Sequence, residues 1–340
     1  MGYRLTSQQF DNYLTQLSIK YQLFAPQRKS GKGSFSDTDL ISYGPVTSYE
    51  DMELQEKSAY SPKEVFYPIR ETLFQFINNK IVEPEIDTKP IILFLRPCDI
   101  NGIKRLDAMF LKNGSEQDYY YLRRRKLLKF VLIECIEGFD SCFCVSMNAN
   151  KTEEYDAAIR IEGEEILWKV KDQDLELEEL KLGVTQDFEP QFIQENKVKV
   201  TIPLVEAVTK ETFNHELWKE YTSRCIGCGR CNAVCISCSC FSMQDVQVSK
   251  EHNIGERRRV WASCHVDGFT NMAGGHQFRD KNGDRMRFKT MHKINDFYKR
   301  FGYHMCVGCG RCDDICPEYI SFSKCINKLN EIVMEGKKDE

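Results

Sequence analysis

The sequence predicts an α/β domain over residues 1–205 and an α-helical, cysteine-rich domain over residues 206–340. Two observations predict this architecture. In the first half, an apolar stretch of strand length, a helical stretch and a second apolar stretch follow one another, an order typical of a parallel βαβ crossover. In the second half, one four-cysteine run occurs twice, and a long insertion at 236–305 separates the two copies.

The composition indicates the class of protein. The chain has 340 residues, of which 41% are hydrophobic and 29% charged, as is ordinary for a soluble globular protein of two or three domains. Its net charge of −4 gives no general attraction to nucleic acid. The N-terminus has no apolar signal region and no 18-residue apolar run occurs, so we expect a cytoplasmic protein without a membrane span. Sixteen cysteines with C-x2-C spacing favour metal binding over disulfides.

Two helices are expected before the first buried strand. Apolar residues at helical spacing from Phe10 to Tyr21 predict an amphipathic helix that begins near Ser7. Ser61 and Pro62 predict a second helix, as an N-cap followed by a proline at the first helical position. The apolar stripe of this second helix would consist of Val65, Ile69, Leu73 and Phe76.

The expected βαβ unit ends in cysteines. Pro90–Arg96 and Leu127–Glu134 have the length and apolar content of strands buried on both faces, and residues 100–110 between them have helical spacing. Cys98 follows the first strand and Cys135 follows the second. Parallel strands would place both cysteines at the carboxyl edge of the sheet, where open α/β sheets bind their ligands.

Three further elements are expected along the chain. Residues 155–171 alternate in a way that predicts a β-hairpin. An apolar stripe at 213–221 predicts a helix that leads directly into Cys225, and residues 320–334 predict a closing helix with Cys325 on its apolar side.

The repeated cysteine run is the most specific motif in the sequence. Its two copies are Cys225-x2-Cys228-x2-Cys231-x3-Cys235 and Cys306-x2-Cys309-x2-Cys312-x3-Cys316, the second followed by Pro317. This is the spacing of a bacterial two-cluster ferredoxin, in which three cysteines of a run bind one cluster and the fourth binds the other. The predicted ligand sets are Cys225, Cys228, Cys231 and Cys316 for cluster 1, and Cys306, Cys309, Cys312 and Cys235 for cluster 2.

The residues between the cysteines agree with two [4Fe-4S] clusters. Gly227, Gly229, Gly308 and Gly310 stand between the predicted ligands, where a chain wrapped around a cluster needs unusual dihedral angles and has no room for a Cβ. A zinc ribbon is the alternative, but it uses two C-x2-C pairs without the additional cysteines of this run. The sequence therefore predicts an α-helical, two-[4Fe-4S], ferredoxin-like C-terminal domain with a long insertion.

The cysteines of the N-terminal half suggest a third cluster. Cys142 and Cys144 lie on the loop after the second buried strand, close in sequence to Cys135. We hypothesise a third [4Fe-4S] cluster held by Cys98, Cys135, Cys142 and Cys144 at the carboxyl edge of the sheet. The alternative is that these four are small buried hydrophobic residues, since free cysteine is among the most buried residue types.

The insertion at 236–305 is locally basic. Its basic residues include Arg257, Arg258, Arg259, Arg279, Lys281, Arg285, Arg287, Lys289 and Lys293. They predict either a docking surface for an acidic redox partner or a solvated face. The insertion also contains Cys238, Cys240 and Cys264, which are spare thiols or alternative ligands; Cys238 competes with Cys235 for cluster 2, and the spacing favours Cys235.

Motifs for two-electron chemistry are absent from the sequence. It has no G-x-G-x-x-G after a predicted strand, no P-loop lysine and no nucleophile–base pair, so we expect no flavin, NAD or siroheme in this chain and no catalytic residues. Iron–sulfur clusters pass single electrons. The chain is therefore predicted to transfer electrons between partners and not to catalyse a reaction itself.

Four segments resemble a known family. They are Arg96-Pro97-Cys98-Asp99, Ser141-Cys-Phe-Cys144, Glu256 through Cys264, and Arg300 through Tyr319. Through them nearly the whole chain resembles the iron–sulfur electron-transfer subunit of anaerobic, siroheme-containing sulfite reductase. The resemblance implies a cytoplasmic complex in which a flavin subunit oxidises NADH, this chain carries electrons, and a siroheme subunit reduces sulfite to sulfide.

Two alternatives remain. The N-terminal cysteine set is also similar to that of the iron–sulfur β subunits of soluble nickel–iron hydrogenases, which would make the partner a hydrogenase. The other alternative is a structural role, in which the clusters organise an assembly or nucleic-acid-binding module without redox function.

Overall fold

The main sheet forms one side of the molecule. The computed structural model describes residues 1–78, 80–249 and 254–336. In spatial order the eight strands of this sheet are β10 (Val184–Thr185), β1 (Gly2–Thr6), β9 (Glu165–Val170), β8 (Ala157–Glu162), β7 (Leu128–Ile133), β6 (Ile91–Leu95), β2 (Gln22–Lys29) and β3 (Leu40–Pro45). The four central strands β2, β6, β7 and β8 are parallel, and the outer strands are antiparallel to their neighbours.

Several predicted elements are confirmed. The βαβ unit consists of β6, α3 (Pro97–Leu111) and β7, with Leu93 opposite Phe130 in the parallel ladder. Strands β8 and β9 form the predicted hairpin. Helix α1 (Ser7–Lys20) begins where expected, because Thr6 and Gln9 form a reciprocal capping box at its start. The α/β architecture of the N-terminal half is thus present.

The predicted second helix is wrong over most of its length. Only α2 (Lys63–Phe66) forms; Leu73 and Phe76 of the apolar stripe belong to the strand β4 (Arg70–Ile77), and Ile69 directly precedes it. Pro68 explains the break, because a proline disfavours helical dihedral angles at the residue before it. Tyr67 accordingly has φ −127° and ψ 85° and ends the helix.

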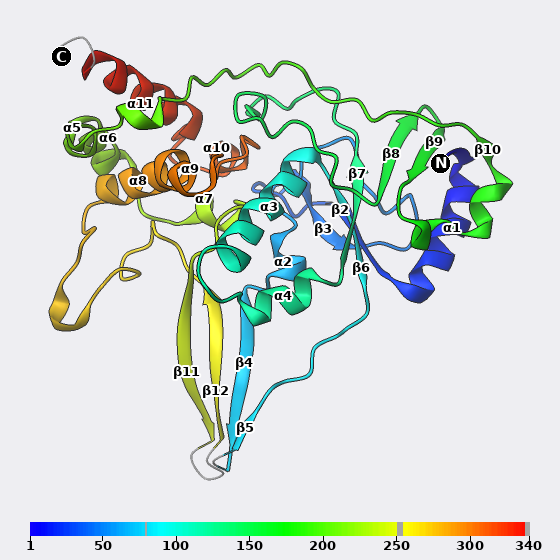
Figure 1. The fold of residues 1–340 in the computed structure, drawn as a ribbon, viewed down its shortest axis with the longest axis horizontal. Coiled ribbons are helices and arrows are strands. Elements are labelled where there is room, and N and C mark those ends of the chain that lie inside the picture. The colour runs from blue at the N-terminus through cyan, green and yellow to red at the C-terminus, as the bar shows by residue number, and fades with distance from the viewer. Residues whose placement is uncertain (79, 250–253, 337–340) are drawn as a thin grey trace.

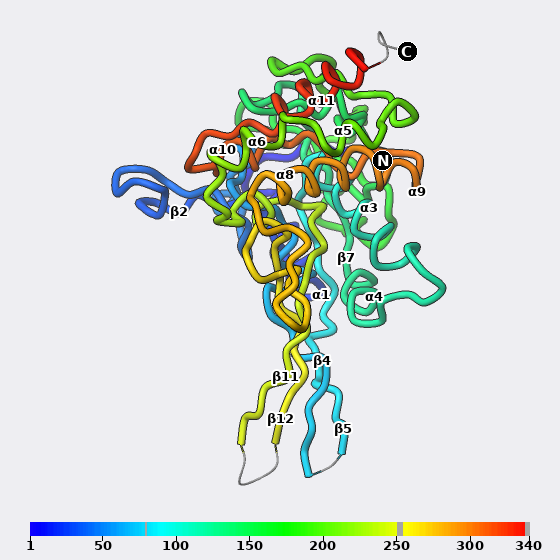
Figure 2. Tube along the Cα trace, turned by 90° about the vertical axis from the view of Figure 1, so that its left-hand side faces the viewer, coloured from blue at the N-terminus to red at the C-terminus, as the bar shows by residue number. Residues whose placement is uncertain are grey.

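A second sheet projects from the body as an arm (Figures 1 and 2). Its strand order is β11 (Phe241–Ser249), β12 (Ile254–Trp261), β4 and β5 (Lys80–Val82), all antiparallel. The arm combines two strands of the insertion with two strands from the N-terminal half. Part of the insertion is thus a hairpin that extends the fold outward, within a C-terminal half that the sequence predicts as helical.

The other helices are short apart from α11, and most of them lie around the cysteine runs, whereas α4 lies beside α2 and α3 (Figure 1). They are α4 (Tyr119–Arg125), α5 (Lys210–Asn214), α6 (Leu217–Arg224), α7 (Arg230–Ala233), α8 (Asn282–Met291), the π-helix His292–Asp296, α9 (Phe297–Phe301), α10 (Arg311–Asp314) and α11 (Phe322–Gly336). The 3-10 turns are η1 (Gln173–Leu175), η2 (Glu178–Leu182), η3 (Val205–Ala207) and η4 (Ala273–Gly275). The closing helix is confirmed as α11, and the helix expected at 213–221 is divided between α5 and α6. None of the helices described is long and apolar enough to cross a membrane.

A loop from the main sheet lies directly on the second cysteine run. The backbone N–H of Phe143 donates to the carbonyl of Gly308 at 2.8 Å. A Cβ added to Gly308 would lie 2.5 Å from the carbonyl oxygen of Phe143, and one added to Gly310 would lie 2.4 Å from that of Ser141. Both glycines also have left-handed dihedral angles, with φ of +66° and +72°. Two backbones therefore touch where only glycine fits.

A buried ion pair reinforces the same junction. Arg311 donates from both terminal nitrogens to Asp99, at 2.5 and 2.8 Å, and both side chains are at most 2% exposed. Its remaining donors bind the carbonyl and the hydroxyl of Ser58. Because Asp99 follows Cys98 and Arg311 precedes Cys312, the pair fixes the first turn of α3 against the second cysteine run.

Substitution of Gly308 by alanine tests this close approach. Left-handed φ costs an alanine about 1 kcal/mol, and overpacking against Phe143 adds about 2 kcal/mol. We expect Gly308→Ala to lower the urea midpoint of unfolding clearly. Gly302→Ala is the matched control, because Gly302 has φ +78° and nothing within 4 Å of an added Cβ, so only the dihedral cost applies. Equal midpoints for the two variants would contradict the backbone contact.

Candidate metal centres

The first predicted ligand set surrounds one cavity. Cys225, Cys228, Cys231 and Cys316 all line one cavity. Cys225 caps the C-terminus of α6, Cys231 lies in α7, and Cys316 follows α10. The fourth cysteine of the second run therefore lies beside the first three of the first run, as cluster exchange between the runs requires.

The second predicted set surrounds a neighbouring cavity. Cys235, Cys306, Cys309 and Cys312 line it, whereas Cys238 does not. This arrangement favours Cys235 over Cys238 as the fourth ligand. Cys231 and Cys312 line both cavities, so the two candidate centres share a wall.

The two cysteine loops have the same conformation. Gly229 and Gly310 are left-handed N-caps of α7 and α10, with φ of +74° and +72°. The N–H of Gly227 lies 3.4 Å from Cys225 Sγ, and the N–H of Gly308 lies 3.4 Å from Cys306 Sγ. Each loop thus directs backbone donors toward sulfur, which stabilises thiolate ligands and tunes a bound cluster.

Two buried lysines beside these cavities indicate that a group bound there is negatively charged. Lys289 and Lys293 are each 3% exposed, and Lys293 Nζ donates to Cys235 Sγ at 3.4 Å and to Ser237 Oγ at 3.0 Å. Burial lowers the pKa of both lysines, but the surrounding thiols, led by Cys231 for Lys289 and Cys235 for Lys293, raise both pKa values above the ordinary range. A buried ammonium needs a compensating negative charge. A cluster with four thiolate ligands would supply that charge.

The thiols themselves need a bound metal. Burial raises the pKa of Cys306 to about 12 and the pKa of Cys312 well above the ordinary value. Thiolate is the form that binds metal, so burial without metal disfavours the ligand form of these two cysteines. Iron would stabilise the thiolates, as metal binding generally releases the protons of its ligands.

The arrangement suits a cluster better than a single ion. Four cysteines on one zinc ion converge to about 2.3 Å from a common point. Within residues 1–78, 80–249 and 254–336, no group of three or more His, Cys, Asp or Glu side chains forms such a single-ion site. The cysteines instead line cavities, which is consistent with four thiolates at the corners of a larger cubane.

The structure also groups the four N-terminal cysteines. Cys98 lies in the first turn of α3 and Cys135 follows β7, so both occupy the carboxyl edge of parallel strands as predicted. Burial, and then the thiols of Cys142 and Cys135, raise the pKa of Cys144 to about 12. Cys142 Sγ lies 3.6 Å from the carbonyl of Cys309. The hypothetical third centre would therefore lie beside cluster 2.

Five of the nine basic residues named above for the insertion form ion pairs within the protein, so fewer of these charges are free for a partner than the sequence alone suggests. The docking surface and the solvated face both stay predictions. The ion pairs are Arg257 with Asp245, Arg258 with Glu256, Arg259 with Glu71 and Asp118, Arg285 with Asp267, and Arg287 with Asp284. The sequence shows the charges but not the carboxylates they meet, some of which lie far away along the chain.

Lysines near the cysteines are the functional residues that sequence reasoning missed. Lys289 and Lys293 look like ordinary members of a basic stretch, and Lys57 belongs to no motif. Lys57 Nζ donates to Ser141 Oγ and to Asp314, both at 2.7 Å, and so connects the two cysteine loops. The only sequence signal was the spacing of Lys289 and Lys293 by four residues on one helical face.

The remaining cysteines have structural surroundings. A hydrogen bond with Cys264 lowers the pKa of Cys240, and Asn232 donates to Cys264 Sγ at 3.0 Å. Cys325 is fully buried on α11, beside Thr290. Burial lowers the pKa of His265 to about 3, so the imidazole near Cys225 is neutral. Of these groups, His265 lines the first cavity.

Comparison with known proteins supports this assignment. Residues 224–320 match the family described as a 4Fe-4S dicluster domain. The sequence prediction of a ferredoxin-like domain with two [4Fe-4S] clusters is confirmed at that level. Its ligands individually stay a prediction.

One relative covers nearly the whole chain. The chain is 29% identical to sulfhydrogenase 2 subunit beta of Pyrococcus furiosus over 342 residues, covering 96% of this chain and 98% of the relative. No solved structure matches. The relative is a hydrogenase subunit, so it favours the alternative interpretation over the predicted sulfite reductase subunit, which has no support among these comparisons.

Serine substitutions distinguish Cys235 from Cys238. We expect Cys235→Ser to lose about four irons per chain, because it removes a ligand from the second cavity. Cys238→Ser should keep the full iron content, since Cys238 does not line that cavity. Iron and acid-labile sulfide analysis after anaerobic purification measures both. The reverse pattern would assign Cys238 as the ligand.

Proposed function

We propose that this chain is the iron–sulfur electron-transfer subunit of a hydrogenase complex. The observation that carries the proposal is the similarity over nearly the full length to a sulfhydrogenase β subunit, together with two cavities lined by the cysteines of the dicluster motif. The assignment extends to the third [4Fe-4S] cluster at Cys98, Cys135, Cys142 and Cys144.

The protein's contribution is to hold the clusters close together and to exclude water. A bound [4Fe-4S] cluster accepts and releases one electron at a time. Cys231 and Cys312 form the wall between the first two cavities, and the contact of Cys142 with Cys309 brings the third set beside the second. The proposed order is therefore cluster 1, cluster 2 and cluster 3, with cluster 2 in the middle.

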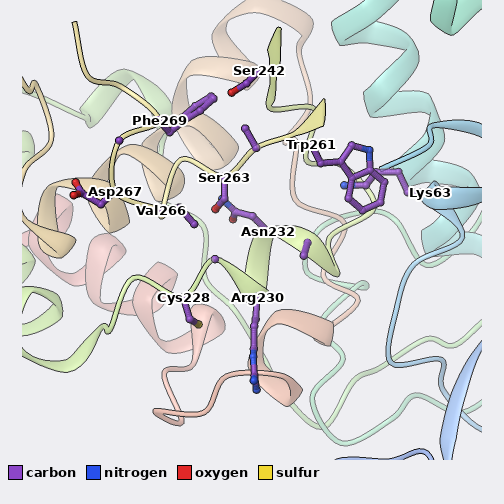
Figure 3. A pocket seen from close by; sticks show the side chains of 14 residues that line it. Lys63, Cys228, Arg230, Asn232, Ser242, Trp261, Ser263, Val266, Asp267 and Phe269 are labelled. Atoms are coloured by element: carbon purple, nitrogen blue, oxygen red, sulfur yellow. The ribbon is translucent and has the colours of Figure 1, made fainter. Parts of the chain in front are cut away.

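Cluster 1 is the proposed point of exchange with a partner. Cys228 is the one exposed cysteine among the sixteen, and neighbouring Ile226 is 60% exposed. Cys228 also borders an open pocket (Figure 3), whose wall includes Trp261 with Lys63 Nζ 3.9 Å from its ring centroid. By contrast, Cys306 and Cys309 of cluster 2 are buried, and Cys235 and Cys312 are only partly exposed, so cluster 2 is the less accessible of the two.

The sulfite reductase interpretation is the second candidate. It is favoured by the four segments quoted from the sequence, among them Arg96 through Asp99 and Ser141 through Cys144. In that case the partners would be a flavin subunit that oxidises NADH and a siroheme subunit. Both candidates assign the same electron-carrying role to this chain and no flavin, NAD or siroheme.

Purification of the native complex through a tag on this chain tests the partner. We expect nickel in the complex and reduction of the clusters by hydrogen gas. Siroheme absorption, with oxidation of the reduced clusters by sulfite, would select the sulfite reductase instead. If the clusters of the isolated chain cannot be reduced at biological potentials, a structural role replaces both candidates.

Substitution of Cys98 tests the third cluster. Three clusters hold about twelve irons per chain, and we expect Cys98→Ser to retain about eight. Reduction of clusters 1 and 2 by hydrogen through the proposed exchange point at cluster 1 should continue, but transfer across the chain through cluster 3 should fall sharply. Cys240→Ser is the control outside the three sets. Unchanged iron content in Cys98→Ser would remove the third cluster from the proposal.

A further inference from the structure

Two buried lysines differ in which of the two cysteine cavities they line. Lys289 lies on α8 and lines both cavities, whereas Lys293 lies in the π-helix that follows and lines only the second. The residues are four apart, so they project from the same side of a continuous helix. A π-helical turn changes the direction of the side chains that follow it and often marks a functional site.

Among the residues that the structure describes, neither lysine forms an ion pair with a carboxylate, whereas nearby cations do. Arg311 is paired with Asp99 and Lys57 with Asp314. Lys293 Nζ donates to Cys235 Sγ at 3.4 Å, and Lys289 lines both cavities together with Cys231 and Cys312. Lys289 also lies 4.7 Å from the centroid of the Phe322 ring. The negative charge that balances these ammonium groups therefore comes from the cysteine sites.

Charge at this position acts on the redox state of a cluster. Reduction adds one electron and so one negative charge to the cluster. A nearby ammonium stabilises the more negative, reduced state, and does so strongly inside a protein, where screening by water is weak. Net charge around a cluster is among the factors that set its reduction potential.

We propose that Lys289 raises the reduction potentials of both clusters 1 and 2, and that Lys293 raises the potential of cluster 2 alone. This inference rests on the proposed function, because it requires the two [4Fe-4S] clusters. The two lysines do not carry electrons themselves; their charges adjust the potentials of the clusters that do. Through Lys289 the protein adjusts the potentials of both clusters together, and through Lys293 it adjusts the potential of cluster 2 separately.

A potentiometric titration of the full-length, cluster-loaded chain tests the proposal. Dithionite supplies the electrons, and electron paramagnetic resonance measures the fraction of each cluster reduced at each potential. We expect Lys289→Met to shift two reduction steps to lower potential. Lys293→Met should shift one of those two steps and leave the other in place. Lys324→Met is the matched control, since Lys324 is exposed on α11, and it should shift neither.

The pattern of shifts decides between the outcomes. Unchanged potentials in Lys289→Met, or equal shifts of both clusters in Lys293→Met, would overturn the inference while leaving the clusters and the proposed function intact. Absence of reducible clusters in the unsubstituted chain would instead overturn the proposed function. Iron and sulfide analysis of every variant precedes the titration.

If Lys289→Met abolishes cluster binding, two further variants still test the role of the charge. Lys289→Gln also removes the charge, and Lys289→Arg retains it. Clusters with unsubstituted potentials in Lys289→Arg, together with loss of cluster or lowered potentials in both neutral variants, support a role for the charge. Loss of both clusters in all three variants would show that the lysine has only a packing role, and would overturn the inference.

Discussion

The buried ion pair between Asp99 and Arg311 is the interaction on which the cysteine arrangement depends. Two guanidinium nitrogens of Arg311 donate to the two carboxylate oxygens of Asp99, and both side chains are almost completely shielded from water. A buried pair contributes little net stability against a hydrophobic alternative, but loss of one partner leaves a charge that costs several kcal/mol. Its main consequence is therefore geometric. One partner follows Cys98 and the other precedes Cys312, so the pair aligns the carboxyl edge of the main sheet with the second cysteine run.

The direct backbone contact then fixes the distance across this junction. Gly308 and Gly310 are needed for the turn around their own cysteines and also for the approach of the 141–144 loop. The same two residues thus serve both the local loop and the contact between halves of the chain. Lys57 adds a third connection through Ser141 and Asp314. Three independent contacts of different chemistry hold the N-terminal cysteines beside the dicluster region.

The sequence predicts the parts of the site that depend on local spacing. The ferredoxin run predicts which cysteines meet, because its loop geometry is repeated and short. The apolar strands likewise predict the sheet edge that carries Cys98 and Cys135. The prediction of the second helix was wrong because one proline, Pro68, divides an apolar stripe whose spacing fits a helix. That signal was present in the sequence, although the pairing of β4 with β12, about 180 residues later, was not.

Ion pairs between residues far apart in the chain are the part of the fold that sequence spacing cannot predict. Arg259 meets Glu71 across the base of the arm, and no periodicity in the chain connects these positions. As a result, part of a stretch that looks like a basic surface is neutralised by ion pairs. Lys289 and Lys293 differ from these arginines, because they lie beside cysteines of the second cavity. Their cost of burial is offset only if the cysteine sites carry negative charge, which couples the stability of this region to its bound clusters.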